Sequence, residues 1–282
     1  MARRARIKFS SEDAVYHVYN RVIGPFDWRP LFDPEARRLF FRILAFLLDV
    51  YCVEPIAYCL MGTHYHLILW VRKATQLSRE DLERRAAALW SQPRHRPKTD
   101  EQWRRFNDRL FDLSAFMKDL QCRFTREFNR LNERRGPLWS GRFKSTLLGP
   151  EAVLVCLHYV EFNPVAASLT KRPEDWVWSS ARARLRGTDS RLWPLTRVTG
   201  IPDPAAALRW FEESRTLYRA NREARARESW WWLQARVVGS ADFVARFIDT
   251  AKEPTRRPLP MANGDWYALD RLRLPRDPAI AA

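Results

Sequence analysis

The stretch Cys52–Val71, CVEPIAYCLMGTHYHLILWV, decides the fold because it contains two adjacent strands and the turn that joins them. Cys52–Leu60 and His64–Val71 are short, apolar and rich in residues that favour strands. Gly62-Thr63 lies between them and favours a turn. The stretch therefore predicts a pair of neighbouring strands in a sheet.

The second of these strands carries two of the chain's five histidines. Residues two apart on a strand share a face, so His64 and His66 project together and Tyr65 points to the opposite face. Two neighbouring imidazoles supply half of the ligands of a divalent-metal site. The alternative is a pair of partly buried histidines that bond to backbone carbonyls. The H-x-H spacing favours the ligand pair, although a third ligand is missing from this strand.

Segments with strand and helix periodicity alternate around this stretch. Their order is strand, helix, strand, strand, helix, strand, helix, which predicts two β-α-β units that share one sheet. We expect an α+β protein with a ferredoxin-like antiparallel sheet, helices packed on it, and a mostly helical C-terminal extension. The other predicted elements are strands at 14–22 and 143–148 and helices at 34–50, 103–132 and 150–162.

Composition divides the chain into three predicted parts. Residues 12–185 contain these elements and form one domain of ordinary size, with a charged insertion at about 75–101. Residues 200–252 are rich in arginine and are predicted to form a helical extension. Pro and Arg accumulate in residues 253–282, a composition that favours disorder.

The chain of 282 residues carries 49 Lys and Arg against 33 Asp and Glu, a formal net charge of +16. This balance favours polyanionic partners, chiefly nucleic acid. A membrane surface is the other class of partner, but no basic amphipathic segment stands out in its favour. The 13 tryptophans suit stacking on single-stranded nucleic acid, although core packing accounts for most of them.

The cysteines and the apolar segments exclude several other classes of protein. The four cysteines form no C-x-x-C pair, so a zinc knuckle or a redox motif has no support. We expect a reducing, cytoplasmic location and no membrane partner. The basic start, MARRARIKFS, has no apolar segment after it, which argues against a secretory signal. Leu39–Val50 is shorter than the roughly 20 residues that a membrane helix needs.

A tyrosine and an asparagine on the last predicted helix are candidates to complete the histidine site. Tyr159 and Asn163 are four residues apart, so they lie one turn apart on the same helix face. Asn163 can offer an amide oxygen to a metal, and Tyr159 can act as a phenol nucleophile. Alternatively, Tyr159 is a half-buried helix residue and Asn163 a helix cap. The residues alone favour this structural alternative.

Two further histidines lie near these residues. His158 points about 100° away from Tyr159 around the helix, which makes it a poor base for the phenol. We expect it to be a surface or phosphate contact. His17, in the first strand, is expected to have a core or supporting role beside the histidine pair rather than to bind metal.

Four motifs, taken together and in order, resemble one known family. They span about residues 14–180 and comprise H-Y-H at 64–66, GPLWSGRFK at 136–144, a tyrosine helix that ends in NPV at 163–165, and PEDWVWSS at 173–180. This set resembles the single-tyrosine HUH transposases, and within them the REP-associated tyrosine transposases and their domesticated relatives. The combination is far more specific than any single motif.

The resemblance implies a fold, a site and a reaction. Residues 12–185 would be the catalytic domain, with Tyr159 as the nucleophile and His64, His66 and Asn163 as ligands of Mg²⁺ or Mn²⁺. The tyrosine would attack single-stranded, hairpin-forming DNA and leave a 5′-phosphotyrosine link and a free 3′-OH. The resemblance also implies a bacterial, nucleoid-associated protein. Ligand softness alone would favour Zn²⁺ or Mn²⁺ over Mg²⁺, because imidazoles dominate the donor set.

The chain departs from the family pattern at two places. Gly62-Thr63 precedes the first histidine where the family usually has Pro-Asn. Ala166 and Ser168 stand after NPV, where a basic residue and glycine are usual. One alternative is therefore a catalytically silent DNA-hairpin-binding protein derived from a transposase. A weaker alternative is a relative that acts in replication initiation or conjugative relaxation.

Basic and aromatic residues near the predicted site are candidates to bind DNA. Rows of arginine on a helix are often only solubilising, and Trp139 can stack on a base or pack under the sheet. The expected partner is single-stranded or hairpin DNA, with a homodimer left open. The candidates are Arg123, Arg126, Arg130, Arg142, Lys144 and Trp139.

Overall fold

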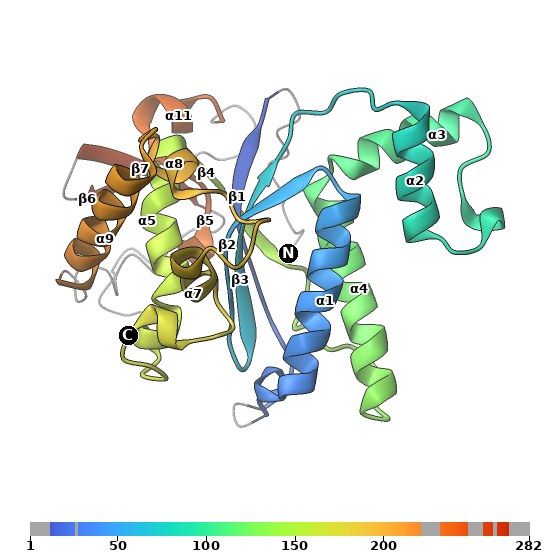
Figure 1. Cartoon of the computed structure of the whole chain (residues 1–282), viewed down its shortest axis with the longest axis horizontal. Helices are drawn as coiled ribbons and strands as arrows, with labels where there is room; N and C mark the ends of the chain where they lie inside the picture. The colour runs from blue at the N-terminus through green and yellow to red at the C-terminus, as the bar shows by residue number, and fades with distance from the viewer. Residues whose placement is uncertain (1–11, 26–27, 221–231, 248–255, 262–263, 271–282) are drawn as a thin grey trace.

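A computed structural model describes residues 12–25, 28–220, 232–247, 256–261 and 264–270. Its centre is a seven-stranded sheet with the strand order β2-β3-β1-β4-β5-β7-β6 (Figure 1). The strands are β1 (Ala14–Arg21), β2 (Val53–Leu60), β3 (His64–Val71), β4 (Lys144–Leu148), β5 (Ala235–Ser240), β6 (Arg256–Met261) and β7 (Gly264–Asp270).

The first four strands confirm the predicted fold class, an α+β protein with a ferredoxin-like sheet. Strand β1 pairs antiparallel with β3 on one side and with β4 on the other, and β2 pairs antiparallel with β3. Helix α1 connects β1 to β2, and α4 lies between β3 and β4 in the chain. This order of strands and helices is that of two interlocked β-α-β units.

Helices α1 (Pro34–Val50) and α4 (Leu113–Leu131) cover one face of the sheet (Figure 1). The α1 helix begins where the sequence predicts, because Asp33 accepts hydrogen bonds from the first free backbone N–H groups, of Glu35 and Ala36. Apolar residues at helical spacing form the buried side of each helix and meet the apolar residues of β1 and β3 in one core. The sheet thus has one face sealed by α1 and α4.

The predicted helix 103–132 is two helices, so that prediction was wrong in its extent. Helix α3 (Asp100–Leu110) ends before Asp112, and α4 begins after it. Asp112 has extended backbone angles, and its carboxylate accepts from the N–H groups of Ser114 and Ala115. An aspartate that caps a new helix competes with continuation of the old one. The charged insertion before it also contains a helix, α2 (Arg79–Leu89).

The opposite face of the sheet is covered by α5 (Pro150–Glu161), and α9 (Pro204–Ala220) packs on the outer side of α5, with a second apolar cluster between these layers (Figure 1). Three short helices, α6 (Asn163–Ala166), α7 (Ser180–Arg186) and α8 (Leu195–Thr199), lie on this side too. The sheet is therefore a middle layer with helices on both faces. In the part of the chain that the structure describes, no helix is both long and apolar enough to cross a membrane.

The C-terminal extension contains α9 but is less helical than predicted. Strand β5 pairs parallel with β4, in the register Leu147 with Val237 and Leu148 with Val238, and is followed by the short helix α11 (Ala241–Ala245). Strands β6 and β7 form an antiparallel hairpin within the segment 253–282, for which composition favoured disorder. Strand β7 pairs antiparallel with both β5 and β6, so backbone pairing between distant segments continues the sheet here, which composition does not indicate. The basic run 221–231 lies outside the described residues.

Candidate active site

The predicted nucleophile and the three predicted metal ligands lie together, on β3, α5 and the start of α6. The rings of His66 and Tyr159 are 5.4 Å apart between centroids and nearly perpendicular. His64 and His66 are 5.1 Å apart between centroids. The Asn163 amide nitrogen lies 3.3 Å from Nε2 of His66. Residues almost 100 positions apart thus meet at one place in the fold.

Strand alternation places the histidines on the α5 side of the sheet, as predicted. The residue between them, Tyr65, is fully buried in the opposite core, where its hydroxyl contacts the side-chain amide of Gln121 at 2.7 Å. Tyr65 therefore cannot compete with Tyr159 for a substrate.

Each histidine is held through its Nδ1 atom. The Thr63 hydroxyl lies 3.0 Å from Nδ1 of His64. His17, on β1, places its Nε2 atom 3.0 Å from Nδ1 of His66. A ligand histidine is ordinarily oriented by a partner on its second nitrogen. Holding both rings by Nδ1 leaves Nε2 as the nitrogen for a ligand or metal.

The Gly62-Thr63 turn has a physical reason in this chain. A Cβ atom on Gly62 would lie 1.9 Å from the ring of Phe32, so only glycine fits beneath that ring. The carbonyl of Gly62 also accepts a hydrogen bond from the backbone of Leu31. The Gly62-Thr63 pair thus packs the turn closely and supplies the hydroxyl that lies beside Nδ1 of His64.

Burial keeps both histidines neutral at physiological pH. It lowers the pKa of His64 to about 4, with Asn163 opposing the effect and the Arg21 charge adding to it. Burial, with smaller effects of His64 and His17, also lowers the pKa of His66 well below its usual 6.5. A neutral imidazole is the form that binds a metal ion.

Tyr159 is a buried phenol, with 9% of its surface exposed. Burial raises its pKa above the ordinary value of 10, and a hydrogen bond from Asn163 opposes that shift. The ring of Trp232 lies 6.3 Å away between centroids, at 30°. Tyr159 is therefore protonated at neutral pH, and Asn163 is the neighbour that favours its ionised form.

The position of Asn163 contradicts one part of the structural alternative for this helix end, its role as the cap. The C-cap of α5 is Phe162, and Asn163 begins α6. Its amide faces His66 and interacts with His64 and Tyr159. It is not the predicted helix cap; it joins the two histidines to the tyrosine.

The donors present fit a divalent ion in part. His64 and His66 offer two neutral imidazoles, and Asn163 offers an amide whose oxygen and nitrogen can exchange places by a rotation of the side chain. Among the described residues, no group of three or more His, Cys, Asp or Glu side chains is arranged so that it could hold a metal ion by itself. The remaining ligands of an ion held here would come from water or from a substrate phosphate.

His158 is buried, so the expectation that it lies at the surface was wrong. Its ring is 3% exposed and lies 2.8 Å through Nε2 from the Ser214 hydroxyl on α9. Phe211 and Tyr218 lie against it. It packs α5 against α9 because it lies on the helix side turned away from the sheet.

The predicted DNA-binding residues occupy two different environments. Arg126, Arg142 and Lys144 are exposed, and Lys144 pairs with Tyr19 on β1, on the face that carries the histidines. Arg130 is exposed and forms an ion pair with Glu127. Their contact with DNA stays a prediction.

Two of the predicted DNA-binding residues have structural partners on the α1 and α4 side. Trp139 packs edge-on against Tyr65 and lies near Phe124. Arg123 donates to the carbonyl of Leu89 and lies over the ring of Phe46. Trp139 is therefore half-buried and packed against the core on this side of the sheet. Its contact with DNA stays a prediction.

Arg21 is a cation near the site that the sequence analysis missed. It pairs with His64 across β1 and β3 and is exposed. Directly opposed residues of an antiparallel pair share a face. The period-2 pattern His17, Tyr19, Arg21 is the signal that would have found it.

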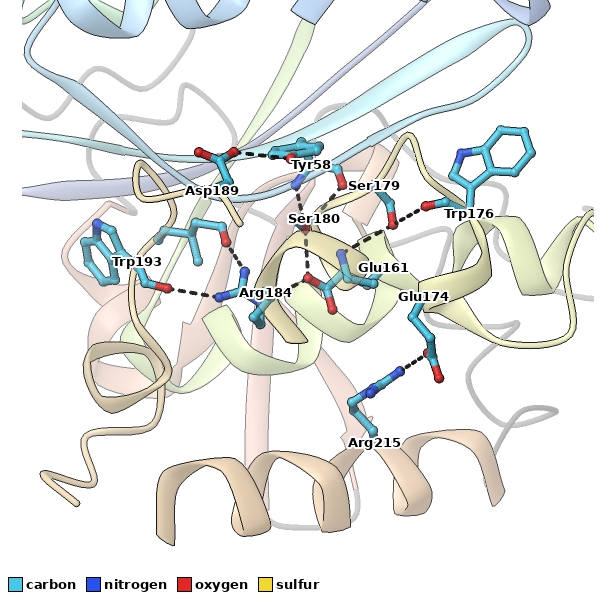
Figure 2. A network of polar contacts seen from close by, with 12 residues as sticks. Tyr58, Glu161, Glu174, Trp176, Ser179, Ser180, Arg184, Asp189, Trp193 and Arg215 are labelled. Atoms are coloured by element: carbon cyan, nitrogen blue, oxygen red, sulfur yellow. Dashed lines mark hydrogen bonds and ion pairs between the residues drawn. The ribbon is translucent and has the colours of Figure 1, made fainter. Parts of the chain in front are cut away.

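The PEDWVWSS motif holds α5 in place. Figure 2 shows Glu161, two residues after Tyr159, facing Arg184 and Ser180 of α7. The Arg184 guanidinium lies 3.1 Å from the Glu161 carboxylate, and both side chains are at most 2% exposed. The Ser180 hydroxyl donates to the same carboxylate at 2.7 Å. This buried network fixes α5 relative to the edge strand β2.

The two tryptophans of the same motif clamp a buried cation. The guanidinium of Arg37, on α1, lies 4.7 Å from the Trp176 ring centroid and 5.3 Å from that of Trp178. Aromatic faces attract a cation in this way. The motif thus passes the edge strand β2 and contacts α5 on one face of the sheet and α1 on the other. Its role in this structure is to hold these helices in place.

No family model matches the chain, and no curated protein matches it either. Among solved structures, a REP-associated tyrosine transposase bound to a REP hairpin is similar to 68% of this chain and 91% of its own, with 14% identity and a TM-score of 0.46. At this degree of likeness, the function of that protein does not transfer to this chain by similarity.

Proposed function

We propose that this protein cleaves and rejoins single-stranded, hairpin-forming DNA through a covalent link to Tyr159, with Mg²⁺ or Mn²⁺ as cofactor. The observation that carries the proposal is the convergence of Tyr159, His64, His66 and Asn163 at one place. The motifs that resemble the single-tyrosine HUH transposases supply the same four residues. The proposed enzyme is thus a transposase or a related nicking and joining nuclease.

In the proposed reaction, the Tyr159 oxygen attacks a backbone phosphorus. A bond forms between that oxygen and phosphorus, and the bond to the 3′ oxygen breaks. The products are a 5′-phosphotyrosine and a free 3′-OH, with the phenol proton lost and one proton gained by the 3′ oxygen. The reverse attack by a 3′-OH rejoins a strand, so no co-reactant is consumed.

The residues around Tyr159 have distinct roles in this proposal. His64, His66 and Asn163 would hold a divalent ion, which polarises the scissile phosphate when bound. Asn163 also hydrogen-bonds the phenol, which favours the ionised tyrosine that attacks.

The charge of the chain supports DNA as the partner. Arg21 and Lys144 are exposed on the face that carries the histidines, and Arg142 is exposed in the loop before β4. A phosphate backbone beside Tyr159 would pass these cations. A DNA substrate would place the protein with the bacterial nucleoid.

One observation favours a second function, a silent hairpin-binding protein. Tyr159 is 9% exposed and lies against the ring of Trp232. If Trp232 stays over Tyr159 when DNA is bound, the nucleophile cannot reach a phosphate. The cations would then bind DNA without cleavage.

A denaturing gel tests the two functions. Labelled hairpin DNA with single-stranded flanks is incubated with the full chain and Mn²⁺, beside Tyr159→Phe and a control, Tyr58→Phe. Tyr58 is a phenol bonded to Asp189, outside the site. We expect a covalent band that needs Mn²⁺, persists in Tyr58→Phe and disappears in Tyr159→Phe.

A mobility-shift assay on the same samples completes the test. Hairpin binding without any covalent band, across a random pool of flanking sequences, would refute the enzyme and support the silent binder. A covalent band that survives Tyr159→Phe would show that another residue is the nucleophile.

A further inference from the structure

We propose that His17 and the main-chain carbonyl of Trp232 form a brace that fixes the tautomer of His66, so that an unprotonated Nε2 faces the site. The catalytic meaning of the brace rests on the proposed function; the brace itself rests on contacts among buried groups. It would make His17 a positioning residue and give the C-terminal extension a place in the active site.

The Trp232 carbonyl sets the direction of the hydrogen bonds that follow from it, first to His17 and then to His66. Nδ1 of His17 lies 3.1 Å from the Trp232 carbonyl oxygen, which can only accept, so Nδ1 carries the proton. In a neutral imidazole, Nε2 of His17 is then an acceptor. It lies 3.0 Å from Nδ1 of His66, which must therefore donate. His66 is left with its lone pair on Nε2.

At the far end, Nε2 of His66 lies 3.3 Å from the side-chain amide of Asn163. An amide can present its nitrogen or, after a rotation of the side chain, its oxygen, so this contact follows the tautomer of His66 and does not decide it. The assignment therefore rests on the two contacts of His17.

The ring geometry supports a direct bond between the two imidazoles. The rings of His17 and His66 lie in planes 6° apart, with centroids 5.2 Å apart. The facing nitrogens are 3.0 Å apart. The remainder of the centroid-to-centroid distance is about one ring radius on each side, so both nitrogens lie close to the line that joins the centroids. The rings therefore meet edge to edge, with the lone pair of one in line with the N–H of the other.

The assignment holds for a neutral His17. A doubly protonated His17 would donate to His66 and reverse the tautomer of that ring. The neutral ring meets both printed contacts, donating to the Trp232 carbonyl and accepting from His66, and the spectrum described below reads its protonation directly.

Trp232 is well placed to be the fixed end of the brace. Its carbonyl also accepts from the Thr146 hydroxyl on β4 at 3.0 Å, and the same hydroxyl lies 2.8 Å from the carbonyl of Ala235. This carbonyl is supplied from outside residues 12–185, because Trp232 lies just before β5 in the extension.

The brace has a measurable consequence for metal binding. With the proton held on Nδ1, His66 presents the lone pair that a metal requires. Loss of a partner of this kind typically weakens metal affinity about 10- to 100-fold. We expect a loss of that size for Mn²⁺ when His17 can no longer accept.

The direct test is the tautomer of His66 in the metal-free full chain. Protein labelled with ¹⁵N at histidine is examined by long-range ¹H–¹⁵N correlation, with His66 assigned from His66→Gln. His17→Phe removes the acceptor. His17→Gln can restore it, because an amide oxygen accepts from His66 while the amide nitrogen donates to Trp232. Thr146→Val is the matched control, since it removes the other donor to that carbonyl.

The expected result is the Nδ1–H tautomer of His66 in the wild type, in His17→Gln and in Thr146→Val, and a mixture in His17→Phe. Mn²⁺ affinity, measured by electron paramagnetic resonance, should fall in His17→Phe and recover in His17→Gln. An Nε2–H tautomer of His66 in the wild type, or a doubly protonated His17 there, would overturn the proposal. The wild-type spectrum therefore tests the proposal even if His17→Phe fails to fold. Because the spectrum needs no DNA, it separates failure of the brace from failure of the proposed function.

Discussion

Glu161 and Arg184 should be among the most sensitive positions of the molecule outside the site. Their side chains are 1% and 2% exposed, and the guanidinium also donates to the carbonyls of Trp193 and Ile56. Glu161→Gln keeps the shape and removes one charge, and Arg184→Met removes the other. Each change leaves an uncompensated buried charge or unfilled hydrogen bonds.

Removing one partner of a buried ion pair costs about 3–5 kcal/mol of unfolding free energy. A loss of about 3 kcal/mol would lower the melting temperature of a chain of this size by about 6–12 °C. We expect each single variant to show at least this shift in calorimetry. The double variant should lose much less than the sum, because neither charge is then left unpaired.

Glu127→Gln is the matched control, because the Glu127–Arg130 pair is exposed, at 40% and 67%. It should cost less than about 1 kcal/mol. Single variants at Glu161 and Arg184 that melt within about 2 °C of the wild type would refute the reasoning. Because Glu161 lies two residues after Tyr159, the same variants should also reduce formation of the covalent band, if the proposed function is correct.

Gly62→Ala should destabilise the protein by about 1–3 kcal/mol, because its Cβ would lie 1.9 Å from the ring of Phe32; thermal unfolding measures this, and Phe32→Leu should relieve it. Arg21→Gln should weaken hairpin binding and reduce the slope of log affinity against log salt by about one, whereas Arg130→Gln, whose charge is already paired, should change less. A Gly62→Ala variant that Phe32→Leu does not relieve would contradict the proposed clash with the Phe32 ring. Equal effects of Arg21→Gln and Arg130→Gln on hairpin binding would contradict a specific role of Arg21. The metal-free protein should lose stability as pH falls from about 6.5 to 4, since the pKa of His64 is lowered to about 4 and the unfolded chain binds the proton first. In His64→Gln, the free energy of unfolding measured by urea titration should change less with pH across that window. An unchanged pH dependence would show that other groups cause it.

The sequence by itself determined the local elements and the faces of the strands. Period-2 alternation placed His64 and His66 on one face and Tyr65 on the other, and helical spacing kept Asn163 one turn beyond Tyr159. Such patterns depend on near neighbours in the chain. For the same reason, the cap at Asp112 was visible in principle, although the apolar periodicity across it predicted one long helix.

Only the tertiary structure decided which distant residues complete the site. Nothing near Trp232 in the sequence indicates that its carbonyl meets His17, 215 positions away, or that β5 continues the sheet beside β4. Burial is likewise a tertiary property: it turned Trp139 and His158 into packing residues and lowered the pKa values of the histidine pair. Sequence patterns report local geometry, whereas long-range pairing and burial depend on the sum of many weak contacts, which no single motif records.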